Sequence, residues 1–388
     1  MSILDIRQWN YPTRIVFGAG AIERLPRLCK SLGMKTPLLV TDAGLKDAAI
    51  TQNAISLVKG SGLAVEIFND VKGNPTASNV EAGVAAYKSG KHDGVIAFGG
   101  GSGLDAAKTI AFMSKQSLPV WHFDDATPGW KDAIADALPP VIAVPTTSGT
   151  GSEVGRASVI SNEESKTKKI IFHPSMMPEV ALCDPELTRG LPAHLTAATG
   201  FDALVHCFEA FCAPGYHPMA DGIALEGLRL GSEHLPRAVA DGNDMEARAQ
   251  MMTVAAMGAT AFQKGLGGVH ALSHSIGAKY DTHHGLTNAV VMPYVVQANR
   301  EVIGSQMEQV SRTLGLKTQG FDAVFEWILA LRESVGIPHS AADLGVDLAD
   351  AIELGERSIA DPTAAGNPVS LTAAQYSEIF TKACEGSL

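Results

Sequence analysis

Hydrophobic and polar positions follow two different patterns along this chain. In the first half, short apolar runs of strand length are separated by stretches in which apolar residues recur every three or four positions. This alternation predicts βαβ units, and hence a parallel sheet with helices on its faces. We expect strands at 15–17, 37–41, 64–68, 94–98, 140–144, 157–160, 169–172 and 180–183. Helices are predicted over about 47–60, 78–90 and 104–113.

The pattern changes between residues 185 and 192. Beyond this point β-branched alternation almost disappears, and alanine-rich segments with helical periodicity follow one another. We expect helices over about 194–211, 219–238, 245–264, 267–279, 287–302, 304–314, 322–335 and 371–384. The length of 388 residues also favours more than one core. We therefore predict an α/β domain over residues 1–188 and an all-α domain over residues 189–388.

Composition narrows the class of protein. The hydrophobic content of 46% and the charged content of 18% fit a globular enzyme, and the net charge of −11 argues against a nucleic-acid partner. No apolar run is long enough for a membrane span, so no membrane partner is expected. The first twenty residues lack a basic region followed by an apolar stretch, so we expect no secretion signal. The five cysteines form no CxxC pair, which favours a reduced, cytoplasmic setting.

A glycine-rich loop follows the strand expected at 94–98. Gly99, Gly100, Gly101 and Ser102 stand between this strand and an apolar helix. Backbone amides at the start of a helix bind phosphate through hydrogen bonds and the helix dipole, so this loop is a candidate site for a dinucleotide pyrophosphate. A second glycine motif at 18–20 has Glu23 where a small residue is needed, and we interpret it as a tight turn into a helix.

Polar residues after other strands extend this candidate site. Asp42 ends the strand at 37–41, where such folds read ribose hydroxyls, and a carboxylate there favours NAD over NADP. Thr146 and Thr147 follow the strand at 140–144 and offer uncharged donors, although this loop could simply cap a helix at Ser152. Asn74 lies in a turn before a helix, and either a turn role or a cofactor contact is open for it.

Histidines concentrate in one stretch of the second half. Residues 262–288 contain His270, His274, His283 and His284, four of the twelve histidines in the chain. Imidazole is the commonest metal-binding side chain and the commonest proton carrier near neutral pH. We therefore interpret this stretch as the floor of an active site. His274 follows His270 by one helical turn, which makes it a candidate proton carrier or a neighbour of the nicotinamide ring.

A carboxylate completes a candidate metal site. Asp202 and His206 are four residues apart in an apolar helical pattern, so they share one face of a helix. A purely structural hydrogen bond between them is the alternative. His270 and His284 are too far apart for one helix to place both on one ion, but a turn near Asp281 would let the chain fold back. One oxygen and three nitrogens suit Fe(II) or Zn(II) and leave a position for a substrate oxygen.

The chain resembles the iron-containing (group III) alcohol dehydrogenases over nearly its whole length. Several long motifs carry this resemblance and occur in the family's order: the loop from Gly99 with Asp105 and Lys108, PTTSGTGSE (145–153), DPELT (184–188), ATGFDALVHCFEAF (198–211) and GLGGVHALSHSIGAKYDTHHGLTNAVVMPY (265–294). The resemblance implies a Rossmann-like NAD domain followed by a helical metal domain, in a dehydroquinate synthase-like architecture. It also implies a homodimer or a higher homo-oligomer.

The resemblance assigns roles to individual residues. The family's metal ligands fall on Asp202, His206, His270 and His284, and the second histidine of its HxxxH motif falls on His274. The NAD-preferring acid falls on Asp42, and the pyrophosphate loop runs from Gly99 to Ser102. We also expect the following residues to contribute to the cofactor site: Asp105, Ser152 and Lys169.

Two departures from the family border the expected substrate pocket. The chain has one residue fewer between Phe262 and Gly265 than typical members, and His283 stands where most members have proline. Phe262 and His283 are therefore candidate pocket residues, and the resemblance does not identify the substrate. The complete ligand set disfavours the related metal-free maleylacetate reductases.

The sequence thus predicts reversible oxidation of a small primary alcohol to its aldehyde, with NAD as hydride acceptor and Fe(II), or alternatively Zn(II), as Lewis acid. Three alternatives stay open at this point: a zinc polyol dehydrogenase similar to glycerol dehydrogenase, a specialised hydroxy-acid or aldehyde reductase on the same fold, and a non-redox metal enzyme similar to dehydroquinate synthase. A protein that only binds metal is disfavoured, because it would have no need of a phosphate-binding loop.

Overall fold

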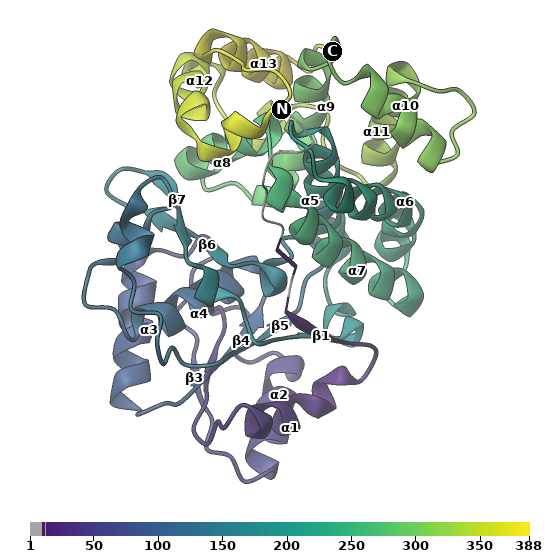
Figure 1. Ribbon diagram of the computed structural model, residues 1–388. Helices are drawn as coiled ribbons and strands as arrows, with labels where there is room; N and C mark the ends of the chain where they lie inside the picture. The colour runs from purple at the N-terminus through teal and green to yellow at the C-terminus, as the bar shows by residue number, and fades with distance from the viewer. Residues whose placement is uncertain (1–9, 12) are drawn as a thin grey trace. The chain divides into compact units, whose positions relative to one another are not determined.

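The computed structural model of the chain describes residues 10, 11 and 13–388. The expectation about a secretion signal concerns the first twenty residues, of which 1–9 and 12 lie outside the described residues. The described chain forms two compact units (Figure 1). The α/β unit consists of residues 13–147 and 151–189, and the helical unit of residues 10–11, 148–150 and 190–388. The predicted domain boundary between residues 188 and 189 stays a prediction.

A six-stranded parallel sheet forms the centre of the α/β unit, which confirms the predicted fold class of this half. The strands lie in the following order: β1 (Arg14–Phe17), β8 (Val180–Cys183), β5 (Val141–Pro145), β4 (Val95–Gly99), β2 (Leu38–Val40) and β3 (Glu66–Phe68). All five strand pairs are parallel. The remaining two strands, β6 (Ala157–Asn162) and β7 (Thr167–Phe172), form a separate antiparallel hairpin.

Both faces of this sheet are covered, which explains why its strands appear as continuous apolar runs in the sequence. Leu38 and Val40 pack in one core with α3 (Ala77–Ser89) and α4 (Gly101–Met113). The intervening Leu39 packs in a second core with α1 (Leu25–Ser31) and α2 (Ala49–Gly60). In Figure 1, α1 lies beside α2 and α3 lies beside α4. Short 3₁₀ helices complete the unit at Ala21–Arg24, Val120–Phe123, Pro128–Asp132, Ser152–Val154, Pro174–Met176 and Pro185–Thr188.

The second unit is helical, as predicted, and surrounds one large apolar core. Its α-helices are α5 (Ala193–Cys212), α6 (Pro218–Ala240), α7 (Met245–Ala261), α8 (Gly268–Tyr280), α9 (His284–Ala298), α10 (Gly304–Thr313), α11 (Phe321–Ser334), α12 (Ala351–Ala360) and α13 (Ala373–Glu385). Its 3₁₀ turns are Phe262–Lys264, Ala341–Leu344, Leu348–Asp350 and Pro362–Gly366. The long α5 packs against α6, α7 and α9. No helix among the described residues has the length and apolar character required to cross a bilayer.

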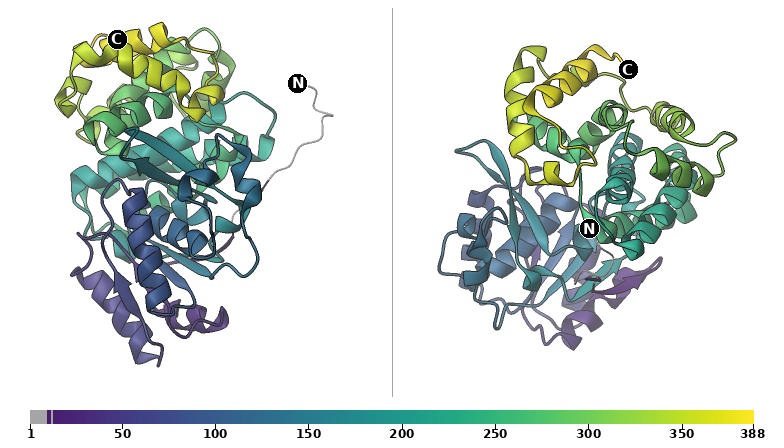
Figure 2. Two further views of the ribbon diagram at one scale, coloured as in Figure 1. Left: turned by 90° about the vertical axis from the view of Figure 1, so that its left-hand side faces the viewer. Right: turned by 45° about the horizontal axis from the view of Figure 1, so that its top comes forward.

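Two differences from the sequence expectation affect how helices pack and where His284 lies. α12 was not predicted, because it is short and contains Gly355, and glycine normally disfavours a helix interior. A side chain at Gly355 would meet the Ala373 carbonyl oxygen at 2.4 Å, so this glycine permits close packing of α12 and α13, which Figure 2 shows side by side. α9 begins at His284, three residues before the predicted start, because the His283 side chain caps it. The early start places His284 in the first turn of the helix.

Candidate active site

Three neighbouring strands of the parallel sheet end at the same edge. β5, β4 and β2 are adjacent and parallel, so their carboxyl ends lie together. The chain continues from β2 outward to β3, but from β4 outward to β5 on the opposite side. Open α/β sheets bind nucleotides at such a reversal of strand order. The predicted cofactor residues Asp42, Gly99–Ser102 and Thr146–Thr147 all follow these three strand ends.

The loop from Gly99 to Ser102 leads from β4 directly into α4. Gly99 has a φ of 145°, a conformation that side chains rarely permit. A Cβ added at Gly103 would lie 3.2 Å from the carbonyl oxygen of Phe98, so glycine is required where α4 starts close to the strand. The first amides of α4 therefore lie at the strand edge, where a helix start attracts an anion.

Two predicted cofactor residues lie against this loop. An added Cβ at Gly99 would be 3.5 Å from Asp42 Oδ2, while Asp42 Oδ1 accepts a hydrogen bond from the Leu45 amide at 3.1 Å. The Thr146 amide donates to the Gly99 carbonyl at 2.9 Å. Asp42 Oδ2 thus lies near the loop, and its contact with a ribose hydroxyl stays a prediction.

Further contacts of the loop involve Thr147 and the turn at Gly73. Thr147 Oγ1 lies 3.4 Å from the position that a Cβ of Gly100 would take. The Ser102 hydroxyl donates to the carbonyl of Gly73, the residue before Asn74. The structure therefore brings the loop, both threonine positions and the Asn74 turn to one edge of the sheet.

Three other predicted cofactor residues use their polar groups within the protein. Asp105 accepts from the Ser152 hydroxyl at 2.5 Å and from the Val159 amide at 2.9 Å. Lys169 Nζ forms an ion pair with Asp124 Oδ2 at 2.6 Å. The contacts of Asp105 link α4 to the loop after β5 and to the hairpin, and Lys169 links the hairpin to the residue after the 3₁₀ helix Val120–Phe123. These contacts are those of residues that hold the shape of the cofactor site. Direct contact with the cofactor stays a prediction for Asp105, Ser152 and Lys169.

Glu153, beside this network, provides a prediction on pH and stability. Its side chain is buried, and burial raises its pKa from 4.5 to about 7, although its backbone hydrogen bond and the charge of Lys108 act in the opposite direction. Between these pH values the folded chain keeps a proton that the unfolded chain releases. The contribution of Glu153 to stability therefore falls as pH rises from about 4.5 to 7 and is constant above that range.

We expect Glu153→Gln to remove this decline. Relative to the original chain, the variant should gain up to about 3 kcal/mol of unfolding free energy between pH 5 and pH 8. Urea unfolding at both pH values measures the difference, and Glu164→Gln, at an exposed position, is the control. Equal pH dependence of Glu153→Gln and the original chain would contradict a buried carboxyl that titrates in this range.

The candidate metal site in the helical unit starts from one face of α5. Asp202 and His206 are separated by four residues and Glu209 follows three residues later, so all three lie on one stripe of this helix. The stripe is buried: the side chains of Asp202 and His206 are 2% and 5% exposed. Burial of a carboxylate among imidazoles in an apolar core is costly unless a cation or hydrogen bonds compensate it.

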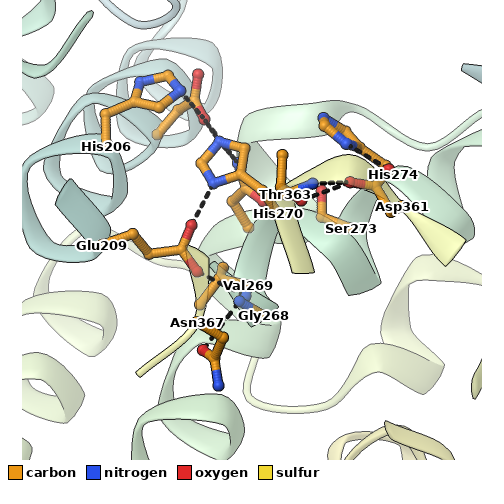
Figure 3. Close-up of polar contacts among 12 residues, drawn as sticks. His206, Glu209, Gly268, Val269, His270, Ser273, His274, Asp361, Thr363 and Asn367 are labelled. Atoms are coloured by element: carbon orange, nitrogen blue, oxygen red, sulfur yellow. Dashed lines mark hydrogen bonds and ion pairs between the residues drawn. The ribbon is translucent and has the colours of Figure 1, made fainter. Parts of the chain in front are cut away.

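Histidines from two further helices meet this stripe, as Figure 3 shows for His270. Asp202 Oδ1 lies 3.9 Å from His206 Nε2, 3.9 Å from His270 Nε2 and 3.7 Å from His284 Nε2. Asp202, His206 and His270 present ligand atoms that all lie within 4.8 Å of one another. His284 completes the arrangement beside Asp202 from the first turn of α9. The four predicted ligands are therefore brought together from α5, α8 and α9.

These distances fit one divalent ion. Four ligand atoms at about 2.1 Å from a tetrahedral ion are about 3.4 Å apart, so a small inward movement would complete the set. Burial lowers the pKa of His206 to about 4, although Asp202 partly opposes the effect, which keeps this imidazole neutral and able to bind metal. His284 is the most exposed of the four, with 24% of its side chain accessible. The site would therefore have its open side near His284.

Asn288 supports this interpretation and was missed by sequence reasoning. Its amide nitrogen lies 2.7 Å from Asp202 Oδ1, 3.2 Å from His270 Nε2 and 3.1 Å from His284 Nε2. Its own Oδ1 is buried and has no hydrogen-bond partner among the described residues. Electron pairs of three ligand atoms thus converge on one small volume, as a cation site requires. The sequence did contain one indication of this role, since Asn288 follows His284 by one helical turn.

His274 lies beside the candidate ligands and forms a pair with Asp361. Its Nδ1 is 3.0 Å from Asp361 Oδ2, and its ring stacks on His284 with 5.2 Å between centroids. The other oxygen of Asp361 accepts from the amide and the hydroxyl of Thr363. Burial raises the pKa of Asp361, but the charge and hydrogen bond of His274 outweigh it, so the pKa lies below the usual value. In the neutral ring, donation from Nδ1 to this carboxylate leaves the lone pair on Nε2, which can then accept a proton.

The two candidate pocket residues occupy different environments. The Phe262 ring packs against His206 at 5.2 Å between centroids, so it lies next to the candidate ligands. His283 is exposed, and its Nδ1 accepts from the Leu286 amide at 3.3 Å as the cap of α9. A part in substrate binding stays a prediction for both residues.

Comparisons with known proteins give matches for both halves of the chain. Residues 12–185 match the family model of iron-containing alcohol dehydrogenase, and residues 196–384 match that of the C-terminal domain of the Fe-containing alcohol dehydrogenase family. The chain is 41% identical to a 4-hydroxybutyrate dehydrogenase of Cupriavidus necator, over 94% of this chain and 97% of that protein.

Two further comparisons concern relatives that act on a diol. The chain is 34% identical to a 1,3-propanediol dehydrogenase of Citrobacter freundii, over 98% of this chain and 100% of that protein. The crystal structure of a 1,3-propanediol oxidoreductase superimposes with a TM-score of 0.91 at 33% identity, over 97% of this chain and 100% of the other.

Proposed function

The chain belongs to the iron-containing alcohol dehydrogenase family, and we propose from this membership that it oxidises a small primary alcohol at the metal site formed by α5, α8 and α9. It is an oxidoreductase that interconverts alcohols and aldehydes, with NAD and a metal ion as the cofactors of its family. The observation that carries the assignment of the site is the convergence of one carboxylate and three imidazoles within 4 Å of Asp202 Oδ1.

Each residue at this site has a defined part in the proposal. Asp202, His206, His270 and His284 hold the ion. When bound, a divalent ion supplies a Lewis acid that lowers the pKa of an alcohol oxygen, and NAD supplies the hydride acceptor. His274 Nε2 receives the alcohol proton, and Asp361 sets the tautomer and orientation of the ring by accepting from Nδ1. Phe262 excludes water beside His206.

A second candidate substrate is 4-hydroxybutyrate, which is also a primary alcohol. Identity favours it, because the chain is 41% identical to the 4-hydroxybutyrate dehydrogenase but 34% identical to the 1,3-propanediol dehydrogenase. Against it, Lys264, the cation nearest to Phe262 in the sequence, pairs with Asp221 at 2.5 Å and donates to the Phe211 carbonyl at 3.0 Å, so its ammonium group is already engaged. We therefore place the small uncharged alcohol first.

Formation of NADH from NAD tests the proposed function. Metal-stripped protein is supplied with Fe(II) without oxygen, or with Zn(II), and tested with 1-propanol, 1,3-propanediol and 4-hydroxybutyrate. If turnover depends on metal and kcat/KM is higher for the uncharged alcohols than for 4-hydroxybutyrate, the first candidate is supported. If kcat/KM is higher for 4-hydroxybutyrate, the second candidate is supported. Bound metal and bound NAD without NADH formation from any of the three would contradict the redox assignment.

The proposed NAD preference depends on Asp42. In Asp42→Ser the carboxylate that repels a 2′-phosphate and accepts from a 2′-hydroxyl is lost. We expect kcat/KM with NADP to rise, and kcat/KM with NAD to fall, by about tenfold each, which corresponds to about 1.4 kcal/mol per change. Asp47→Ser, at an exposed position of the same loop, is the control and should change neither value. Unchanged cofactor preference in Asp42→Ser would place ribose recognition elsewhere.

We further propose a cytoplasmic homodimer or higher homo-oligomer. The described cysteines are all free thiols, and four of the five are buried, which fits a reducing compartment. Mass determination by sedimentation would establish the assembly in solution.

A further inference from the structure

Glu209 contacts a candidate metal ligand without being placed to bind the ion itself. It lies on α5 after His206, and its side chain is 6% exposed. Glu209 Oε2 is 2.6 Å from His270 Nδ1, the ring nitrogen that faces away from Asp202. Glu209 Oε1 accepts from the Val269 amide at 2.7 Å. Figure 3 shows the carboxylate between α5 and the start of α8, with one oxygen toward each partner.

These contacts fix the tautomer and the orientation of the His270 imidazole. A carboxylate only accepts hydrogen bonds, so His270 must carry its proton on Nδ1. The lone pair of Nε2 is then directed toward Asp202, and ring rotation would break the bond to Glu209. α8 begins at Gly268, so the hydrogen bond from the Val269 amide to Glu209 also holds the first turn of this helix in place. His270 lies in that turn and is held with it.

We propose that Glu209 is a positioning residue of the metal site, which sets the tautomer and orientation of His270 and so strengthens binding of the ion. The inference rests on the proposed function only in taking His270 as a metal ligand. Hydrogen bonds from carboxylates to metal-binding imidazoles raise metal affinity by about 10–100-fold in other proteins.

A purely structural role is the competing explanation, since Glu209 also caps the start of α8. The chain contains a matched control for that role. Asn367 Oδ1 accepts from the Gly268 amide at 3.0 Å, one residue before Val269, and its amide is paired with Asn299. Asn367 thus caps the same helix from a buried position, but its hydrogen bonds involve none of the candidate ligands.

Metal affinity and stability of Glu209→Gln and Asn367→Ser separate the two roles. Zn(II) affinity is measured by competition with a chelator, and Co(II) absorption reports the ligand geometry. Urea unfolding of the metal-stripped proteins measures the structural effect. We expect Glu209→Gln to bind Zn(II) about 10–100-fold more weakly with an altered Co(II) spectrum. Asn367→Ser should lose stability but bind Zn(II) as the original chain does.

The outcomes distinguish this inference from the proposed function. Zn(II) affinity of Glu209→Gln within threefold of the original chain, with an unchanged Co(II) spectrum, would overturn the positioning role. The positioning role would also be overturned if Asn367→Ser, at the same loss of stability, lost as much Zn(II) affinity as Glu209→Gln. If Glu209→Gln does not fold, Glu209→Asp, which keeps the charge on a shorter side chain, is judged by the same criteria. Failure of the original chain to bind Zn(II) or Co(II) would contradict the metal site itself.

Discussion

Replacement of His270 by alanine should abolish metal binding and reduce turnover at least about 10³-fold. His270 is fully buried between Asp202 and Glu209, so its loss removes one ligand and leaves two carboxylates facing a cavity. Loss of a Lewis acid costs several kcal/mol of transition-state stabilisation, and each 1.36 kcal/mol corresponds to a tenfold change in rate. Metal content after dialysis and NADH formation at saturating alcohol measure both effects.

His194→Ala is the matched control, because His194 is exposed in the first turn of α5 and lies outside the cluster. It should keep metal and activity. Circular dichroism and urea unfolding separate loss of metal from loss of fold in His270→Ala. Full metal content together with normal turnover in a folded His270→Ala would remove His270 from the site, and the convergence on Asp202 would then need another explanation.

Local spacing alone predicted part of this site, whereas the resemblance to the family was needed to assign His270 and His284 to the same ion. Asp202 and His206 are one turn apart on a helix whose apolar pattern is unmistakable, so their shared face follows from helix geometry alone. The glycine loop was found in the same way, since strand, loop and helix are consecutive. Likewise, the two-sided burial of Leu38, Leu39 and Val40 follows from an uninterrupted apolar run.

The residues that were missed depend on contacts between distant segments. Asp361 meets His274 across 87 residues, and nothing near either residue indicates the partner. Glu209 could have been noticed, because a carboxylate in the apolar run CFEAF on the stripe of Asp202 and His206 needs compensation when buried. Its actual partners, His270 and Val269, lie about sixty residues away and are known only from the fold.

The same limit applies to the predicted cofactor residues. Asp105 and Ser152, which belong to the matching motifs, and Lys169 were expected to contribute to the cofactor site. In the structure Ser152 donates to Asp105, and Lys169 pairs with Asp124. A motif identifies residues that a site needs, but it does not separate those that touch a ligand from those that hold the loop. That distinction requires the hydrogen-bond partners.

The second large effect is expected at His274, where the proton of the alcohol should leave. Proton transfer by a positioned side chain contributes about 10²–10⁴-fold to rate, so His274→Ala should lower kcat about 100-fold or more. The ion should stay bound, because its four proposed ligands are unchanged. This separation of metal content from turnover distinguishes His274 from His270. It is measured on the same protein samples by metal analysis and by NADH formation.

Asp361 should act through His274 and not independently. In Asp361→Asn the acceptor for His274 Nδ1 is replaced by an amide that can donate instead, which favours the wrong tautomer and orientation of the ring. We expect about a tenfold or larger loss in kcat, and we expect the double variant with His274→Ala to be no slower than His274→Ala alone, because the two residues work as one unit. Thr363→Val, which removes one hydrogen bond to Asp361 but leaves the pair intact, should cost much less. Additive losses in the double variant would mean that Asp361 supports the fold around α12 and does not orient the proton carrier.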